Sequence, residues 1–267
     1  MTEPTFTHAL VREVSRSLGD CDLTHLPRQR INLPRARQQQ QEYVDALRAT
    51  GIDVTVLPEE PALPDAVFVE DMALMLDELI VVCRPGSASR RPEVGRIAPV
   101  LAALGPLSRI ESPGTLDGGD VLTIDKTLFV GLSERTNREG LRQLESIVTR
   151  HGCRVVPVTI KGCLHLKTAI TQVARHAVLA NPQWVTLAPF AEFEVLTVPA
   201  TEPWGANTLW ANETLLTTAS APGTTDLLRS HGLNAHPVEI SELQKAEAGL
   251  TCLSLLFRKP GGERTAL

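Results

Sequence analysis

The sequence predicts an α/β protein made of five similar units that close into a ring. Four segments share one pattern, in which a short apolar strand, a polar turn and a second apolar strand follow one another. In three of the four, a helical stretch and a further strand come next. The segments recur at intervals of somewhat under fifty residues, which is typical of propellers and stacked arrays.

The four strand–turn–strand segments are expected to form β-hairpins. They occupy 70–85, 119–134, 167–182 and 206–221. Each has a polar pair of residues between two apolar runs, which is the sequence signature of a hairpin. We expect the turns at 77–78, 125–126, 175–176 and 212–213.

Four helical stretches are expected, each followed by a glycine, the residue that most often caps a helix C-terminus. These glycines are Gly51, Gly105, Gly152 and Gly232. A strand is expected after each glycine, over 52–58, 106–112, 153–159 and 233–240. The third hairpin lacks an obvious helix, because the mixed segment 183–199 takes its place.

A fifth unit has to be assembled from both ends of the sequence. The stretch LTCLSLLFRKP (250–260) is the remaining candidate for a first strand, and THALVREV (7–14) is its candidate partner. Their pairing would close the ring and leave few exposed strand edges. Two α/β lobes with coincidental similarity also satisfy the pattern.

Each unit carries a polar or reactive residue where its first hairpin strand begins. In chain order these are Glu70 with Asp71, Asp117 with Asp120, His165, Asn207 and Cys252. Taken singly, His165 and Cys252 are typical of buried core residues. In a closed ring, however, all these positions converge on the axis. The repeat therefore predicts a central site with a nucleophile, a proton shuttle and an orienting carboxylate.

Composition and cysteine content restrict the classes of protein that fit this sequence. The 267 residues carry a net charge of -5 and are 43% hydrophobic, and we expect one catalytic domain over 1–267. The basic stretch 28–37 has no interleaved aromatics, so nucleic-acid binding is not expected. The first twenty residues match neither a signal peptide nor a membrane span. Five cysteines without a CxxC pair argue against structural zinc or disulfides and favour a cytoplasmic location.

Six motifs follow one another between residues 65 and 257: FVEDMAL, RPGSASRRPEV, GTLDGGDVL, FVGLSERTN, LHLKT and LTCLSL. Together they resemble the dimethylarginine dimethylaminohydrolase family of the guanidine-modifying superfamily. The resemblance implies a five-bladed α/β propeller of strand–strand–helix–strand repeats around a central active-site channel. It also implies hydrolysis of methylated arginines to citrulline and dimethylamine or methylamine, with no metal or organic cofactor.

The resemblance further implies a role for ten residues. Cys252 is the nucleophile, His165 the general acid and base, and Asp117 the carboxylate that completes the triad. Glu70 and Asp71 help to hold the guanidinium group. The amino-acid end of the substrate is bound by Arg90 and Arg135 at the α-carboxylate, and by Asp65 and the backbone carbonyls near Leu18 and Ala246 at the α-amino group.

The expected reaction suits these residue types. A thiol with a pKa of about 8.5 is mostly protonated at neutral pH, and a cationic substrate or a protonated His165 favours the thiolate. We expect the Cys252 thiolate to attack the guanidinium carbon. A covalent thiouronium then forms, and water activated by His165 releases citrulline.

The residue type at position 167 distinguishes members of the superfamily. Arginine deiminases and amidinotransferases resemble this stretch but usually have an aspartate two residues after the histidine, where this sequence has HLK. A dimethylated nitrogen has no N–H donors for such a carboxylate, so the lysine favours a methylated substrate. Arginine deiminase-like or other guanidine hydrolase activity stays open, as does a non-catalytic homologue that binds arginine analogues. The sequence is compatible with a homodimer but does not decide the oligomeric state.

Overall fold

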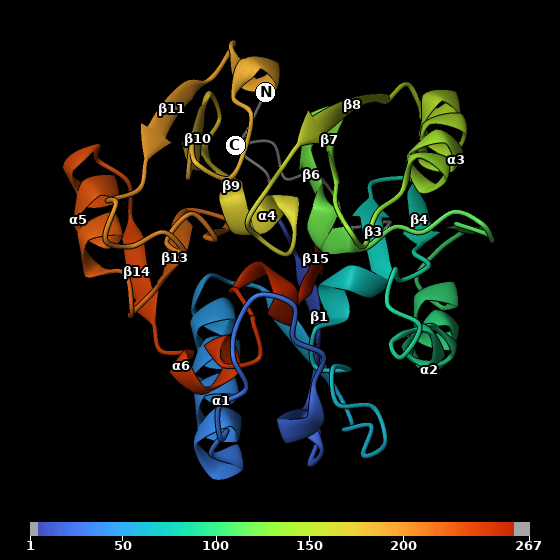
Figure 1. Cartoon of the computed structure of the whole chain (residues 1–267), viewed down its shortest axis with the longest axis horizontal. Coiled ribbons are helices and arrows are strands. Elements are labelled where there is room, and N and C mark those ends of the chain that lie inside the picture. The colour runs from blue at the N-terminus through green and yellow to red at the C-terminus, as the bar shows by residue number, and fades with distance from the viewer. Residues whose placement is uncertain (1–4, 259–267) are drawn as a thin grey trace.

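Five three-stranded sheets surround a common centre in the computed structural model, which describes residues 5–258 (Figure 1). In each sheet the first strand is antiparallel to the middle strand, and the middle strand is parallel to the third. This arrangement confirms the predicted five-bladed α/β propeller. The predicted domain 1–267 extends beyond the described residues at both ends.

The blades follow the chain, except that the first contains strands from both of its ends. Blade 1 consists of β15 (Leu255–Phe257), β1 (His8–Arg12) and β2 (Asp53–Leu57). Blade 2 consists of β3 (Ala73–Leu76), β4 (Leu79–Val82) and β5 (Leu107–Arg109). Blade 3 consists of β6 (Val121–Ile124), β7 (Thr127–Leu132) and β8 (Arg154–Thr159). Blade 4 consists of β9 (Ile170–Ala174), β10 (Ala177–Ala180) and β11 (Glu194–Thr197). Blade 5 consists of β12 (Leu209–Ala211), β13 (Thr214–Thr218) and β14 (Ala235–Val238).

A longer helix joins the middle and third strands in four blades. These helices are α1 (Leu33–Ala49), α2 (Arg91–Ala102), α3 (Arg138–Val148) and α5 (Pro222–Ser230). The two single-turn helices are α4 (Leu166–Ala169) and α6 (Ser241–Gln244). The 3-10 turns are η1 (Leu18–Asp20), η2 (Val69–Met72), η3 (Gly118–Asp120), η4 (Thr149–His151), η5 (Ala188–Phe190) and η6 (Thr251–Leu253). Blade 4 has only η5 at the equivalent place, as the missing helical pattern predicted.

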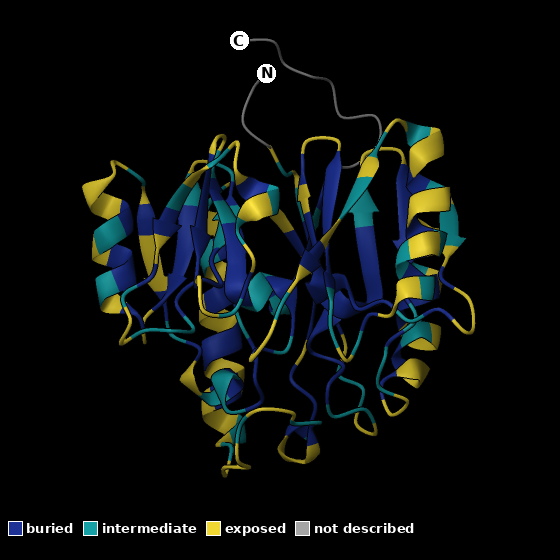
Figure 2. Cartoon of the chain, turned by 45° about the horizontal axis from the view of Figure 1, so that its top comes forward, coloured by how far each residue is buried: buried dark blue, intermediate teal, exposed yellow. Residues whose placement is uncertain are grey.

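The longer helices lie at the periphery, with their outer sides exposed and the strands between them buried (Figures 1 and 2). Helix α1 begins after Asn32, whose side chain accepts the backbone N–H of Arg35. Its buried face includes Tyr43, whose hydroxyl hydrogen-bonds the hydroxyl of Ser254 at 2.7 Å. This contact anchors the backbone two residues beyond Cys252 to the main helix of blade 1.

All four predicted hairpin turns and the pairing of the two ends are confirmed. The turns fall at 77–78, 125–126, 175–176 and 212–213. Strand β15 pairs with β1 and completes the first blade. Residues 259–260 of the stretch that predicted β15 lie outside the described residues.

One predicted helix cap is wrong. Gly51, Gly152 and Gly232 have the left-handed backbone expected after a helix, with φ of 83°, 72° and 78°. Gly105 does not have it. The chain leaves α2 through a right-handed turn at Ala103, so no left-handed residue is needed there.

The expected strand around Cys252 also begins later than predicted. Cys252 lies in η6, and β15 begins three residues further on, at Leu255. Leu250 and Leu253 are both buried and lie one 3-10 turn apart, so their apolar pattern reflects this turn rather than a strand.

Asn212 joins blade 5 to blade 1, and this contact gives a test of the ring. Its left-handed backbone (φ 56°) turns the β12–β13 hairpin, and its amide bonds the N–H and C=O of Phe6 and the C=O of Thr50. Replacing Asn212 by glycine keeps the turn and removes these bonds, so we expect a loss of roughly 2–3 kcal/mol in the free energy of unfolding.

Asp125→Gly is the matched control for Asn212→Gly. Asp125 is also left-handed (φ 52°) but lies exposed in the β6–β7 turn. Its replacement is expected to change stability by less than about 0.5 kcal/mol. Urea unfolding followed by circular dichroism measures both variants. Equal losses would contradict a special role for the contact between blades.

Candidate active site

The starts of the first hairpin strands meet near the centre of the ring. Short turns precede these strands: η2 before β3, η3 before β6, α4 before β9 and η6 before β15. Turn η2 contacts both η3 and η6, and α4 contacts η3. The predicted convergence of polar residues therefore depends on single helical turns that carry their side chains inward.

One cavity collects most of the predicted site residues. Its lining residues are Asp22, Asp65, Phe68, Asp71, Arg90, Arg135, Leu164, His165, Ala246, Glu247, Ala248 and Cys252. Three of the ten predicted residues do not line it. Asp117 and Glu70 lie behind the lining residues, while Leu18 is fully buried in the hydrophobic core next to α1. The backbone carbonyl of Leu18 accepts the N–H of Cys21.

His165 is held between two buried carboxylates. Its Nε2 lies 3.1 Å from Oδ2 of Asp117, and its Nδ1 lies 3.8 Å from Oδ1 of Asp71. Burial alone would lower the pKa of His165, but Asp71 and the hydrogen bond with Asp117 raise it to about 9. At neutral pH the ring is therefore an imidazolium that can donate a proton.

The glycine pair of the LDGGD motif permits this close packing. A Cβ on Gly119 would lie 2.6 Å from Nδ1 of His165 and 2.8 Å from Oδ1 of Asp71. A Cβ on Gly118 would lie 2.0 Å from the carbonyl oxygen of Glu70. Both positions therefore need glycine because neighbouring groups occupy the space of a side chain.

Asp117 is fully buried and fixed from two sides. Its Oδ1 accepts the backbone N–H of Gly86 at 2.9 Å, while Oδ2 faces His165. Its own N–H donates to the hydroxyl of Thr136. These contacts determine which oxygen faces the imidazole and keep the ring in one orientation.

Asp71 links His165 to a buried arginine. One carboxylate oxygen accepts the N–H of Gly119 at 3.0 Å, and the other lies 2.5 Å from a guanidinium nitrogen of Arg90. Burial would raise the pKa of Asp71, but His165 and Arg90 lower it to about 2. Asp71 is thus an anion at the wall of the cavity.

The thiol of Cys252 is in an environment that opposes its ionisation. Burial, followed by the negative charges of Glu70 and Asp71, raises its pKa to about 12. The N–H of Gly249, 3.4 Å from Sγ, and the ammonium group of Lys167 act in the opposite direction. The unliganded protein therefore holds Cys252 as a thiol at neutral pH.

Glu93 is a site residue that the sequence analysis missed. It lies one turn after Arg90 on α2, and its two oxygens accept two N–H groups of that guanidinium at 3.1 and 2.9 Å. Burial raises the pKa of Glu93 to about 7. The sign of this pair in the sequence is the spacing of three residues between Arg90 and Glu93. Such pairs on a helix are usually exposed, so the spacing alone does not predict a buried pair.

A further contact beside the cavity was not predicted from the sequence. The carboxylate of Glu247 accepts the backbone N–H groups of Thr24, His25 and Leu26 at 2.5–3.1 Å. Glu247 has φ of 60°, a strained conformation for a residue other than glycine. The carboxylate of Glu247 thus holds the segment 24–26 beside the lining residues Ala246 and Ala248. Arg135 donates a further hydrogen bond to the hydroxyl of Thr24.

The geometry offers one group of candidate metal ligands among the described residues. Asp71, Asp117 and His165 place one potential ligand atom each within 4.8 Å of the others. Asp71 is already paired with Arg90, and Asp117 already accepts an N–H of Gly86. Two of the three candidate ligands therefore already have partners within the protein, and the expectation of no metal stays a prediction.

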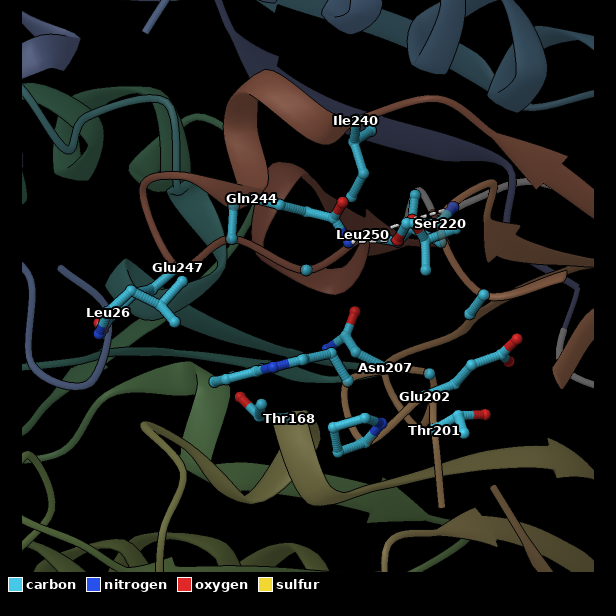
Figure 3. A pocket seen from close by; sticks show the side chains of 17 residues that line it. Leu26, Thr168, Thr201, Glu202, Asn207, Ser220, Ile240, Gln244, Glu247 and Leu250 are labelled. Atoms are coloured by element: carbon cyan, nitrogen blue, oxygen red, sulfur yellow. Dashed lines mark hydrogen bonds between the residues drawn. The ribbon is translucent and has the colours of Figure 1, made fainter. Parts of the chain in front are cut away.

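A second cavity of about 270 Å³ lies beside the first and shares Glu247 and Ala248 with it. Figure 3 shows Thr168 and Asn207 on one side of it and Gln244 and Leu250 on the other. It contains neither Cys252 nor His165. The carboxylate of Glu202 in its wall already accepts two backbone N–H groups at the start of α5.

No helix within residues 5–258 combines the length and the apolar character needed to cross a bilayer. All five cysteines are free.

Comparisons with known proteins agree on one family. The model of a family described as "N,N dimethylarginine dimethylhydrolase, eukaryotic" matches residues 25–186. The N(G),N(G)-dimethylarginine dimethylaminohydrolase of Pseudomonas aeruginosa is 34% identical over 254 residues, covering 94% of this chain and 100% of the relative. The protein of the same name from Streptomyces coelicolor is 37% identical over 254 residues, covering 94% and 97%.

A solved structure extends the likeness to the fold. It is the Pseudomonas aeruginosa protein, as a cysteine-to-serine variant in complex with citrulline, with a TM-score of 0.92 and 33% identity. The match covers 95% of this chain and all of that structure. The family model spans more than half of the sequence, and relatives above 30% identity cover nearly all of it, so this chain belongs to the dimethylarginine dimethylaminohydrolase family.

Proposed function

We propose that the protein hydrolyses asymmetric dimethylarginine and monomethylarginine to citrulline and dimethylamine or methylamine. The observation that carries this proposal is the convergence of Cys252, His165 and Asp71 on one cavity. This set supplies a nucleophile, a charged proton donor and an anion for a cationic substrate. Family membership points to the same chemistry.

In the proposed mechanism, substrate binding activates the thiol. A guanidinium cation next to Cys252 offsets the negative charges that raise the thiol pKa, so the thiol loses its proton to solvent. The thiolate then forms a bond to the guanidinium carbon. His165 donates its proton to the methylated nitrogen, and the bond between that nitrogen and carbon breaks.

The second half of the reaction uses the neutral imidazole. A thiouronium remains on Cys252 after the amine leaves. His165 accepts one proton from water as the water oxygen bonds the same carbon. The carbon–sulfur bond then breaks to release citrulline, and the second proton of the water passes to the departing sulfur and restores the Cys252 thiol. Asp117 stabilises the imidazolium at the start and end of this cycle through its contact with Nε2.

The amino-acid end of the substrate is proposed to lie toward Arg135, Asp65 and Ala246, which line the same cavity. Arg90 has most of its N–H groups committed to Asp71, Glu93 and the backbone carbonyls of 65 and 68. Arg135 has fewer such contacts, and we therefore propose it as the main partner of the α-carboxylate. The cytoplasmic location and the homodimer stay predictions.

Purified protein is expected to form citrulline from asymmetric dimethylarginine and monomethylarginine faster than from arginine. Colorimetric detection of citrulline measures this, and Cys252→Ala should remove the activity because no other group can form the covalent bond. Faster turnover of arginine would favour the deiminase alternative. Failure of the wild-type protein to turn over any of the three would favour a binding protein.

The ionisation of Cys252 can be tested with two reagents of similar shape. Because the thiol pKa is raised to about 12, neutral chloroacetamide should label Cys252 only slowly at pH 7, and its rate should rise about tenfold per pH unit up to pH 10. Cationic chloroacetamidine should label it readily at pH 7. Mass spectrometry of the Cys252 peptide measures both rates. A plateau with chloroacetamide below pH 9 would show that the thiolate forms without a cation.

Arg135→Met is expected to raise KM for asymmetric dimethylarginine about 10- to 100-fold, as loss of a charged hydrogen bond predicts, with a smaller change in kcat. The reason is that the α-carboxylate is remote from the reacting carbon. Arg138→Met is the control, because Arg138 is exposed at the start of α3. A substrate with an esterified carboxylate should lose its sensitivity to Arg135. Equal effects on both substrates would assign Arg135 another role.

A further inference from the structure

The ammonium group of Lys167 is largely shielded from solvent. Its side chain is 15% exposed, and Nζ lies 2.5 Å from Oε1 of the buried Glu70. The other oxygen of Glu70 accepts the hydroxyl of Thr251 at 2.8 Å, next to Cys252 in the chain. Each oxygen of this carboxylate therefore already has a donor.

Asn207 holds this pair in place from blade 5. Its amide nitrogen donates to the carbonyl of Lys167 at 2.9 Å and to the hydroxyl of Thr251 at 3.1 Å. Its carbonyl oxygen accepts the N–H of Thr251 at 3.2 Å. A Cβ on Gly249 would lie 2.3 Å from the Asn207 side chain, so this amide has little room to move.

Glu70 and Lys167 both act on Cys252, in opposite directions. The charge of Glu70 opposes ionisation of the thiol, and the charge of Lys167 favours it. The resident cation thus offsets one of the two anions close to the sulfur. Both carboxylates near Cys252 therefore have resident partners before a substrate guanidinium approaches. Asp71 is paired with Arg90, and Glu70 is paired with Lys167.

We propose that Lys167 determines substrate specificity by occupying Glu70 and so removing an acceptor that an unmethylated guanidinium would use. Arginine presents five N–H donors, and asymmetric dimethylation replaces two of them with methyl groups. An arginine bound here leaves donors without acceptors, which is costly in a desolvated site. The dimethylated end has no such requirement. This inference rests on the proposed function and concerns the same site.

Lys167→Met tests the proposal, because it keeps the length of the side chain and removes the charge. We expect the ratio of kcat/KM for asymmetric dimethylarginine to that for arginine to fall about tenfold, the equivalent of one modest hydrogen-bond contribution. Lys167→Gln is a second variant in case the first is unstable. Lys126→Met, in the exposed β6–β7 turn, is the matched control and should leave the ratio unchanged.

A double-mutant cycle identifies the partner of Lys167. In a Glu70→Gln background, Lys167→Met should not change the ratio of kcat/KM for dimethylarginine to that for arginine any further. The reason is that the carboxylate paired with Lys167 is then absent. A remaining effect would show that Lys167 acts through another group and would overturn the proposal. Equal loss of activity toward both substrates, with a shifted pH profile for alkylation of Cys252, would also overturn it and assign Lys167 to thiolate stabilisation.

The two hypotheses fail in different ways. If the wild-type protein does not turn over dimethylarginine, the proposed function is wrong. If the wild-type protein does so and Lys167→Met leaves the ratio unchanged, the function stands and the specificity role of Lys167 is wrong.

Discussion

Asp71 accepts the N–H of Gly119 with one oxygen, pairs with Arg90 through the other, and faces Nδ1 of His165. The rest of the site geometry depends on this carboxylate, because it connects the imidazole of His165 to the guanidinium group of Arg90 in the cavity wall. The contact exists only because residue 119 has no side chain. Three blades therefore meet around one buried anion, and a small displacement of any one would separate His165 from its partners.

Four buried carboxylates of the site are paired with resident cations. Arg90 is shared between Asp71 and Glu93, Lys167 pairs with Glu70, and the imidazolium of His165 lies between Asp71 and Asp117. Burying these charges unpaired would be costly, and pairing offsets part of that cost. The thiol of Cys252 differs from these groups, because burial and the nearby negative charges raise its pKa and oppose its ionisation. Such a site is organised for a positively charged substrate before that substrate binds.

Local patterns were sufficient to predict most of the architecture. Alternating apolar residues with a polar break located all four hairpin turns, and the remaining unpaired stretches at both ends predicted the pairing of β1 with β15. These features depend on neighbours in the chain or on the count of available strands. The cap at Gly105 failed because a glycine after a helix permits a left-handed residue but does not require one.

The amino-acid sequence determined which residue types occur in the site, their order, and their recurrence at the blade entrances. It could do so because each repeat unit brings its entrance to the same radius of the ring. The contacts between blades could not be predicted from the sequence. Whether Lys167 points outward or pairs with Glu70, whether Arg90 is solvated or shared with Glu93, and what Glu247 fastens all depend on segments far apart in the chain. Packing places those segments together, and no local pattern records which side chains then fill the space between them.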